Sequence, residues 1–284
     1  MSVSEKLWID GTKVYDTAAT VASPAGFGTI RTLAFGFGTP DQETFLEPRP
    51  LADGLLFRGS VAGQRTFKLR FAVSGVASRG EGYAEWAAFL DLFSTEKGLI
   101  TLKTERDDGA ASPVTRELDI IAMGEPSWSL VRGEGEAGVR YNGNLVIELD
   151  VVAPFPWWRS ATAETETINF SGTGSGNVAI ARLGQMACGV EAKITTNGTL
   201  GSITLDDASR SMTMTATFGA SAKGVDWYFA DPTATVIDSG VTISIPSHLS
   251  LHSASTTITA STADGGASGN HTVTLRYYPL WKSP

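Results

Sequence analysis

The chain has 284 residues, 42% of them hydrophobic, and a formal net charge of −8. This length exceeds the usual domain size of about 100 to 200 residues, so two domains are expected. The acidic balance argues against a protein that holds DNA by neutralising phosphates, because that mode of binding needs clustered Lys and Arg.

The start of the chain and its cysteine content indicate synthesis and folding in a reducing cytoplasm. MSVSEKLWID places charged residues where a secretory signal would need a long apolar run. Cys188 is the only cysteine, which excludes an internal disulfide framework. Its apolar, small-residue surroundings contain no neighbouring base or cation, so it is predicted to be a buried small hydrophobe.

Three segments of the first half alternate apolar and other residues with a period of two. They cover residues 67–73, 118–122 and 145–151, and each predicts a strand with one buried face. The segment from Thr39 to Gly63, which precedes the first of these strands, is rich in Gly and Pro and is long for a plain loop. Long loops of this kind tend to be functional or disordered.

One helix is predicted between the first two of these strands. It begins with Ser78 and Glu81 in capping-box spacing and ends at Lys97-Gly98, a last-turn cation followed by a C′ glycine. The apolar residues spaced three or four apart along it are Tyr83, Trp86, Phe89, Leu90 and Phe93. This stripe predicts ordinary core packing of the helix against a sheet.

The composition changes near residue 155. Up to Phe155 there are 15 Lys and Arg against 21 Asp and Glu, whereas residues 156–284 hold 7 and 9, with Ser, Thr and Gly in their place. The seam is APFPWWRS, in which Pro154 and Pro156 interrupt strand pairing ahead of Trp157 and Trp158. We therefore predict domains at 1–155 and 156–284, joined by this motif.

The second part predicts strands throughout. The candidates are Val178 to Leu183, Ser202 to Leu205, Met212 to Phe218, Val225 to Phe229, Val241 to Ile245, Thr256 to Ala260 and Thr272 to Tyr278. Many short strands joined by Gly, Ser, Asn and Asp turns favour a sandwich of two antiparallel sheets. The whole chain is thus predicted to be mainly β with one helix.

A search for chemistry predicts no catalytic, metal or cofactor site. His248 and His252 share a stretch without an acidic or cysteine partner, and His271 stands apart, so surface or turn histidines are favoured over a metal site. Gly172 to Gly176 lacks GxGxxG spacing and precedes a strand, which favours a flexible turn over a phosphate loop. There is no GxSxG, HExxH or Walker lysine.

Carboxylate pairs leave a glycosidase as an alternative, because that chemistry needs only two acids about 5 to 10 Å apart. Asp206-Asp207 and Glu164 with Glu166 are candidates by proximity, but solvated loop acids are the favoured interpretation.

Two neighbouring aromatic residues, Trp227 and Tyr228, are candidates for a contact surface. Strand alternation sends their rings to opposite faces, so both cannot be core. A subunit contact is favoured over a glycan contact, because aromatic residues are also enriched in protein interfaces.

Several segments, in order, resemble the distal tail protein family of long non-contractile phage tails. They are LWIDGTKVYD, GQRTFKLRFAVSG, the REL strand from Arg116, APFPWW, INFSGTGSGNVAIARLG, ITTNGTLGSITLDD and LRYYPLWKSP. The family motif resembling APFPWW has an acid between its prolines, where this chain has Phe155. The resemblance spans nearly the whole chain.

This resemblance implies a structural, non-enzymatic protein of the virion tail tip. Residues 1–155 would form a tail-tube-like β-sandwich or barrel with one helix, assembled as a hexameric ring between the tail tube and the host-adsorption baseplate. Residues 156–284 would form an outward β-sandwich that is galectin-like or carbohydrate-module-like. The implied partners are further copies, tail tube and hub proteins, a host surface glycan, and DNA passing without specific binding.

Two expectations follow for the ring. The acid excess of residues 1–155 predicts a net acidic lumen, which DNA slides through without sticking. The segment from Thr39 to Gly63 is expected to become ordered only when the ring closes.

Two alternatives stay open. A tail tube or other baseplate subunit would share the first domain, but the second sandwich favours a tip protein. A carbohydrate-binding, lectin-like surface protein would use Trp227 or Tyr228.

Overall fold

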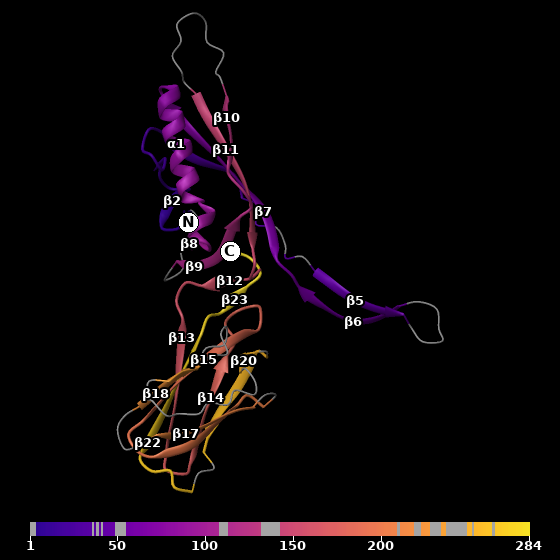
Figure 1. Ribbon diagram of the computed structural model, residues 1–284, viewed down its shortest axis with the longest axis vertical. Coiled ribbons are helices and arrows are strands. Elements are labelled where there is room, and N and C mark those ends of the chain that lie inside the picture. The colour runs from indigo at the N-terminus through magenta and orange to yellow at the C-terminus, as the bar shows by residue number, and fades with distance from the viewer. Residues whose placement is uncertain are drawn as a thin grey trace, which may run out of the picture. The chain divides into compact units, whose positions relative to one another are not determined.

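The chain forms two compact units in this computed structural model (Figure 1). The first comprises residues 1–161 together with 282–284, and the second comprises residues 162–281. The structure describes residues 4–35, 37, 40, 42–48, 55–107, 113–131, 143–208, 211–218, 223–227, 234–236, 249–251, 253–262 and 265–284. The predicted boundary after Phe155 stays a prediction; the last three residues return to the first unit.

The first unit is built on a curved antiparallel sheet. Its strands are β1 (Ser4–Ile9), β2 (Thr12–Asp16), β3 (Val21–Ala22), β4 (Thr29–Phe35), β7 (Arg65–Val76), β8 (Ile100–Asp107), β9 (Val114–Ala122), β10 (Ser127–Val131), β11 (Gly143–Ala153) and β12 (Trp158–Ser160). The main path runs β2-β1-β8-β9-β11-β7-β4-β3, with β10 on β11 and β12 on β9. The Thr32 hydroxyl donates to the Val14 carbonyl at 3.2 Å, which brings the two ends together into a nearly closed barrel.

Alternation explains the core of this sheet. Phe67, Leu69, Phe71 and Val73 are all buried along β7, while the residues between them are not. The partner strand β11 buries Leu145, Ile147, Leu149 and Val151 in the same way. The three strands predicted from period-two patterns, and the mainly β fold, are thereby confirmed.

Helix α1 (Arg79–Leu92) begins as predicted and ends earlier than predicted. The Ser78 hydroxyl accepts from the Glu81 N–H at 3.2 Å, and the Glu81 carboxylate accepts from the Ala77 N–H at 2.7 Å. The predicted end at Lys97-Gly98 is wrong, because Ser94 starts a separate 3₁₀ turn, η1 (Thr95–Lys97), whose Lys97 N–H donates to the Ser94 carbonyl. No helix among the described residues has the length and apolar character needed to cross a membrane.

A β-hairpin replaces the long loop expected between Thr39 and Gly63. It consists of β5 (Gln42–Pro48) and β6 (Leu55–Ala62), which pair in antiparallel register from Gln42 and Ala62 to Pro48 and Leu55. Figure 1 shows it as a separate two-stranded ribbon. The two strands satisfy each other's backbone groups, which explains why the segment is long for a plain loop; its ordering on ring closure stays a prediction.

The second unit contains two antiparallel sheets, as the pattern predicted. One has the order β13-β22-β15-β18-β19 with β20 on β15, and the other the order β14-β21-β16-β17. The strands of these sheets are β13 (Glu164–Ser171), β14 (Ser175–Ala181), β15 (Cys188–Thr196), β16 (Leu200–Asp206), β17 (Ser211–Phe218), β18 (Lys223–Trp227), β19 (Ala234–Val236), β20 (Ser250–Leu251), β21 (Ser255–Ser261) and β22 (Asn270–Tyr277), while the two-residue β23 (Leu280–Trp281) belongs to neither. Predicted strand Val241 to Ile245 lies outside the described residues.

Candidate functional site

The proline–tryptophan motif after β11 belongs to the core of the first unit. Trp158 is fully buried, and the ring of Phe37 meets it edge-on with centroids 4.9 Å apart. Pro156 is buried and Trp157 half-buried, whereas Pro154 and Phe155 are exposed. The motif therefore anchors the chain after β11 through one large aromatic side chain.

An ion-pair cluster fixes the short strand that follows this motif. The guanidinium of Arg159 on β12 donates to both carboxylate oxygens of Asp119 on β9, at 2.6 and 3.2 Å. The Thr101 hydroxyl donates to the same carboxylate at 2.9 Å. Bidentate pairing of this kind adds geometric specificity to the charge attraction, so β12 is held in one register on β9.

Two arginines bind the end of the chain to the first unit. Arg65 on β7 donates to the Lys282 carbonyl at 2.8 Å, and Arg116 on β9 donates to the Ser283 carbonyl at 2.7 Å. Arg65 is buried, and desolvation lowers the pKa of its guanidinium below the ordinary value. Residues 282–284 thus complete the first unit after the chain has passed through the second.

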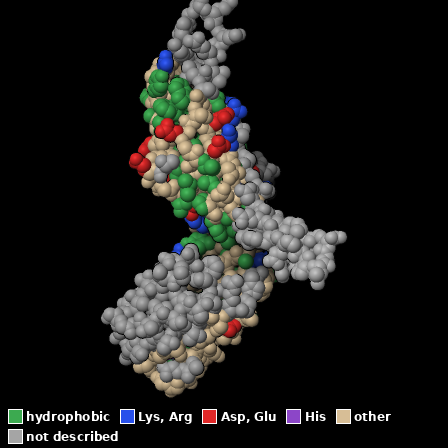
Figure 2. All heavy atoms as spheres, turned by 45° about the vertical axis from the view of Figure 1, so that its right-hand side comes forward, with side chains coloured by type: hydrophobic (Ala, Val, Ile, Leu, Met, Phe, Trp, Pro, Cys, Tyr) green, Lys and Arg blue, Asp and Glu red, His purple; other side chains and the backbone are tan. Residues whose placement is uncertain are grey.

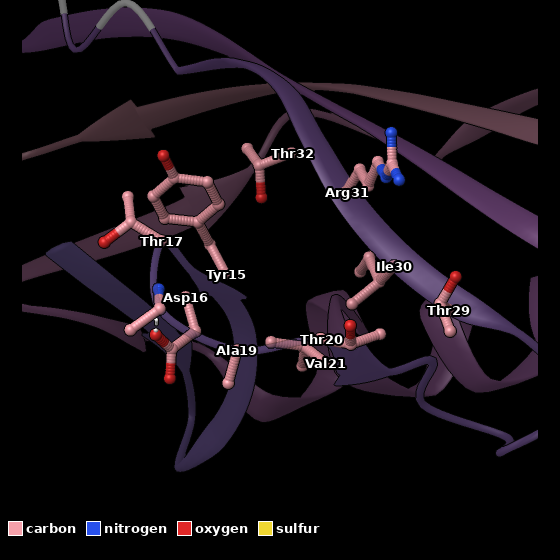
Figure 3. Close-up of a pocket in the computed structure, with 11 residues that line it drawn as sticks. Tyr15, Asp16, Thr17, Ala19, Thr20, Val21, Thr29, Ile30, Arg31 and Thr32 are labelled. Atoms are coloured by element: carbon pink, nitrogen blue, oxygen red, sulfur yellow. Dashed lines mark hydrogen bonds between the residues drawn. The ribbon is translucent and has the colours of Figure 1, made fainter. Parts of the chain in front are cut away.

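A cleft of about 470 Å³ opens between the two ends of the first sheet (Figure 3). It is lined by Tyr15, Asp16, Thr17, Ala18, Ala19, Thr20, Val21, Thr29, Ile30, Arg31 and Thr32. Most of its polar groups already have partners within the protein: Asp16 accepts from Ala18 N–H, and the hydroxyls of Thr29 and Thr32 meet Ser74 and the Val14 carbonyl. The backbone bond from Ala18, together with Lys13, lowers the pKa of Asp16. The lining therefore points to no particular ligand.

The aromatic stripe of α1 divides between core and surface. Phe89 and Phe93 are buried and pack on Phe71 of β7, with ring centroids 5.4 and 6.2 Å apart. Tyr83 is 41% exposed and Trp86 half-buried. The prediction of core packing is therefore wrong for Tyr83, and Trp86 is only partly covered, although both rings contact Trp128 on β10 of the same sheet.

Tyr83, Trp86, Trp128 and Arg79 form what we call the α1 aromatic cluster. The ring of Trp128 on β10 lies 5.3 Å from Tyr83 and 5.8 Å from Trp86. The guanidinium of Arg79 lies 5.5 Å from the centre of the Tyr83 ring and donates to its hydroxyl at 3.0 Å. The cluster is exposed at Tyr83, and sequence reasoning missed it because Trp128 is 45 residues from Tyr83 in the chain.

A buried carboxylate holds the turn between β3 and β4 against the helix. Glu85 is fully buried and accepts from the backbone N–H groups of Ala25 and Phe27 at 3.1 and 2.8 Å, and from the Ser23 hydroxyl. Three donors satisfy this charge, so its role is to fix the turn. The sequence signal for this buried acid is its spacing, because Glu85 lies three or four residues along the helix from the buried Gly82 and Phe89.

The residues considered for metal or catalytic chemistry are dispersed. His271 is buried with its Nδ1 2.8 Å from the Thr196 hydroxyl oxygen, whereas His248 and His252 lie outside the described residues. Within the described ranges, no group of three or more His, Cys, Asp and Glu side chains is arranged to hold a metal ion. Cys188 is buried as predicted, and burial raises the pKa of its thiol to about 11.

The acid pairs and the glycine-rich segment have structural surroundings. Asp207 is buried and accepts from the Ser250 N–H at 3.1 Å, so the expectation of a solvated loop acid is wrong for this residue. Glu164 and Glu166 lie on β13, not on a loop. Residues 172–174 form the predicted turn, in which the Gly174 N–H donates to the Ser171 carbonyl, and Ser175 and Gly176 begin β14.

The predicted contact pair falls at the limit of the described chain. Trp227 ends β18, where it pairs with Ala192 of β15 and Ala234 of β19. Its side chain and the whole of Tyr228 lie outside the described residues. Their role in glycan or subunit contact stays a prediction.

Comparison with solved structures identifies the fold. The crystal structure of Dit from phage SPP1, described as a paradigm of the hub adsorption apparatus in phages that infect Gram-positive hosts, aligns over 96% of this chain and 98% of its own. The TM-score is 0.59 and the identity 10%. A component of the activated baseplate of phage P2 with Ca covers 93% of this chain and 99% of its own, at 14% identity and a TM-score of 0.40.

No protein-family model and no curated protein matches the sequence. The similarity to SPP1 Dit covers both units, so the resemblance predicted from ordered sequence segments is confirmed at the level of the fold.

Proposed function

We propose that this protein is a structural, non-enzymatic subunit of a phage tail tip, where it forms a ring between the tail tube and the host-adsorption apparatus. The observation that carries the proposal is the shared fold with SPP1 Dit along nearly the full length of both chains. A common domain could recur in unrelated proteins, but the succession of two such units in one chain is more specific.

In this proposal the first unit forms the ring. A cyclic ring uses two different patches on each copy and closes by rotation. The first unit offers a nearly closed barrel, exposed apolar side chains and a hairpin paired only with itself in the described chain. Isolated two-stranded hairpins are at best marginally stable in water, which supports the expectation that this hairpin becomes ordered on ring closure.

The second unit would project outward and supply contact with neighbouring tail proteins or with a host surface glycan. Its two sheets give it a core of its own, which includes the buried residues Ile194, Ile203 and Val273. Trp227 and Tyr228 are the residues proposed for glycan contact. Glycan-array binding that is lost on Trp227→Ala or Tyr228→Ala would support that role, and an array without signal would remove it.

Light scattering and negative-stain microscopy of the purified protein test the ring. The expected result is an annular particle of about six copies, the number that the family resemblance implies, in equilibrium with smaller species. A hexamer map would also test the lumen, which is expected to be net acidic because residues 1–155 hold 21 acids against 15 bases. A protein that stays monomeric at all concentrations contradicts the ring, and a basic lumen contradicts the proposed route for DNA.

Hydrogen exchange gives a further test of the hairpin. Its amides are expected to exchange quickly in the dilute monomer and slowly in the ring. Equal protection in both states would contradict ordering on closure.

A further inference from the structure

The second unit is joined to the first unit at both of its ends. The chain leaves the first unit after residue 161 and returns to it at residue 282. Residues 282–284, which we call the strap, therefore attach the second unit in addition to the linker at residues 161 and 162. Domains joined by one connection move relative to each other by default, so a second connection limits that movement.

Main-chain contacts hold the strap on the first unit. The guanidinium of Arg65 on β7 donates to the Lys282 carbonyl at 2.8 Å, and that of Arg116 on β9 donates to the Ser283 carbonyl at 2.7 Å. Both bonds are charge-assisted, which makes each of them stronger than a bond between neutral groups. Because the arginines bind carbonyl oxygens, these two bonds depend on the backbone of the strap and not on its side chains.

The strap also supplies an acceptor to a buried cation. Arg65 is 1% exposed, and its Nε atom has no acceptor in the described chain. The Lys282 carbonyl accepts from the same guanidinium. A buried charged group that loses its partner destabilises the fold, so the first unit favours the attached strap.

Other features of the strap make its attachment reversible. Lys282 and Ser283 are exposed, and Pro284 is half-buried. Pro284 lines a pocket of about 300 Å³ together with Leu7 and Phe37, and this open space shows that its apolar packing is incomplete. Segments with few buried contacts open at a low free-energy cost, without unfolding of the core.

We propose that the strap is a reversible latch. When it is attached, the second unit is held by both of its ends, and when it is detached, the second unit is held by the linker at residues 161 and 162 alone. The covalent connection keeps the strap at a high effective concentration near Arg65 and Arg116, so it reattaches readily. The latch therefore changes the range of movement of the second unit without unfolding either unit, whether or not the protein forms a ring.

Distance distributions measured by double electron–electron resonance test the latch. Spin labels are placed at exposed positions of the two units by Asp91→Cys and Thr167→Cys, and Cys188→Ala removes the native thiol. Labelled copies are diluted with unlabelled protein, so that only distances within one copy are measured. Deletion of residues 282–284 is expected to widen the distribution at least about twofold, because a single connection remains.

Two substitutions separate the latch from an effect on folding. Ser283→Ala is the matched control, since it keeps the carbonyl that Arg116 binds and should retain the parent width. Arg116→Ala removes one of the two bonds and leaves Arg65 with its acceptor, so an intermediate width is expected. Thermal melting by circular dichroism verifies that each variant is folded.

Three results would overturn the proposal. The first is a folded deletion variant that keeps the parent width. The second is a Ser283→Ala distribution as wide as that of the deletion variant, because the side chain would then hold the strap. If the deletion variant does not fold, Arg116→Ala decides, and a parent width in that variant contradicts the latch.

Discussion

The two units differ in where they leave large apolar side chains. Among the described residues, the first unit exposes Phe27, Tyr83, Leu99, Val114, Met123 and Phe155, and the second exposes Leu183. Figure 2 shows hydrophobic side chains gathered in a band along the first unit. Exposed apolar groups that gather on a surface mark contact sites, whereas single ones are ordinary.

The second unit instead directs its apolar residues inward and its hydroxyls outward. On β22, Val273 and Leu275 are buried, while Thr272 and Thr274 between them are partly exposed. Such strict alternation completes a core without a partner. Among the described residues, exposed large apolar side chains are therefore concentrated in the first unit.

Of the substitutions considered, removal of the Trp158 side chain is expected to change the stability of one unit relative to the other by the largest amount. Trp158→Ala leaves a cavity beside Phe37 and is expected to lower the stability of the first unit by about 4 kcal/mol. Calorimetry should show the transition of the first unit at a much lower temperature and that of the second unit unchanged. Phe155→Ala, at a 53% exposed position of the same motif, is the control with little expected effect. Equal shifts of both transitions would show that the units do not unfold separately.

Removing the Glu85 carboxylate tests whether a buried polar clamp holds the first unit together. Glu85→Ala leaves the N–H groups of Ala25 and Phe27 without their acceptor, at an expected cost of about 3 kcal/mol in urea unfolding. The control is Glu81→Ala, which removes an exposed cap contact to the Ala77 N–H and should cost about 1 kcal/mol. Equal losses would mean that Glu85 adds no more than an ordinary helix cap.

Sequence patterns located β7, β9 and β11 and six strands of the second unit, because a buried strand face must repeat every second residue. The pattern could not locate the hairpin, since β5 and β6 build no face of the main sheet. It also could not separate Tyr83 from Phe89 on the helix, because the position of Trp128 depends on the pairing of β10 with β11. The Glu85 clamp and the return of residues 282–284 likewise rest on contacts between distant parts of the chain.

A glycine pair tests the tight packing of the second unit. A Cβ added to Gly198 would lie 1.8 Å from the Ser268 carbonyl oxygen, so the backbone must shift. Gly198→Ala is expected to cost about 2 kcal/mol in the transition of the second unit alone. Gly265→Ala, where nothing lies within 4 Å of the added atom, is the matched control. If the two substitutions cost the same, close packing at this end of the unit does not contribute to its stability.

The smallest expected effect is a pH dependence of the stability of the second unit, which is caused by His271. The Thr196 hydroxyl accepts from the Gly198 N–H, which leaves its proton to be donated to Nδ1 of His271. Protonation of Nδ1 would remove that acceptor and place a charge beside Phe170. Desolvation accordingly lowers the pKa of His271 below its ordinary value.

The sign of the effect follows from this lowered pKa. Above the unfolded-state pKa of about 6.5, both states hold a neutral imidazole and the unit has its full stability. As the pH falls below that value the unfolded state takes up the proton first, so the melting temperature of the second unit should fall between pH 7.5 and 5. The loss is about 1.4 kcal/mol for each unit by which the pKa is lowered. His271→Phe keeps an aromatic ring beside Phe170 and should remove this slope; a slope that persists in the variant would assign it to another group.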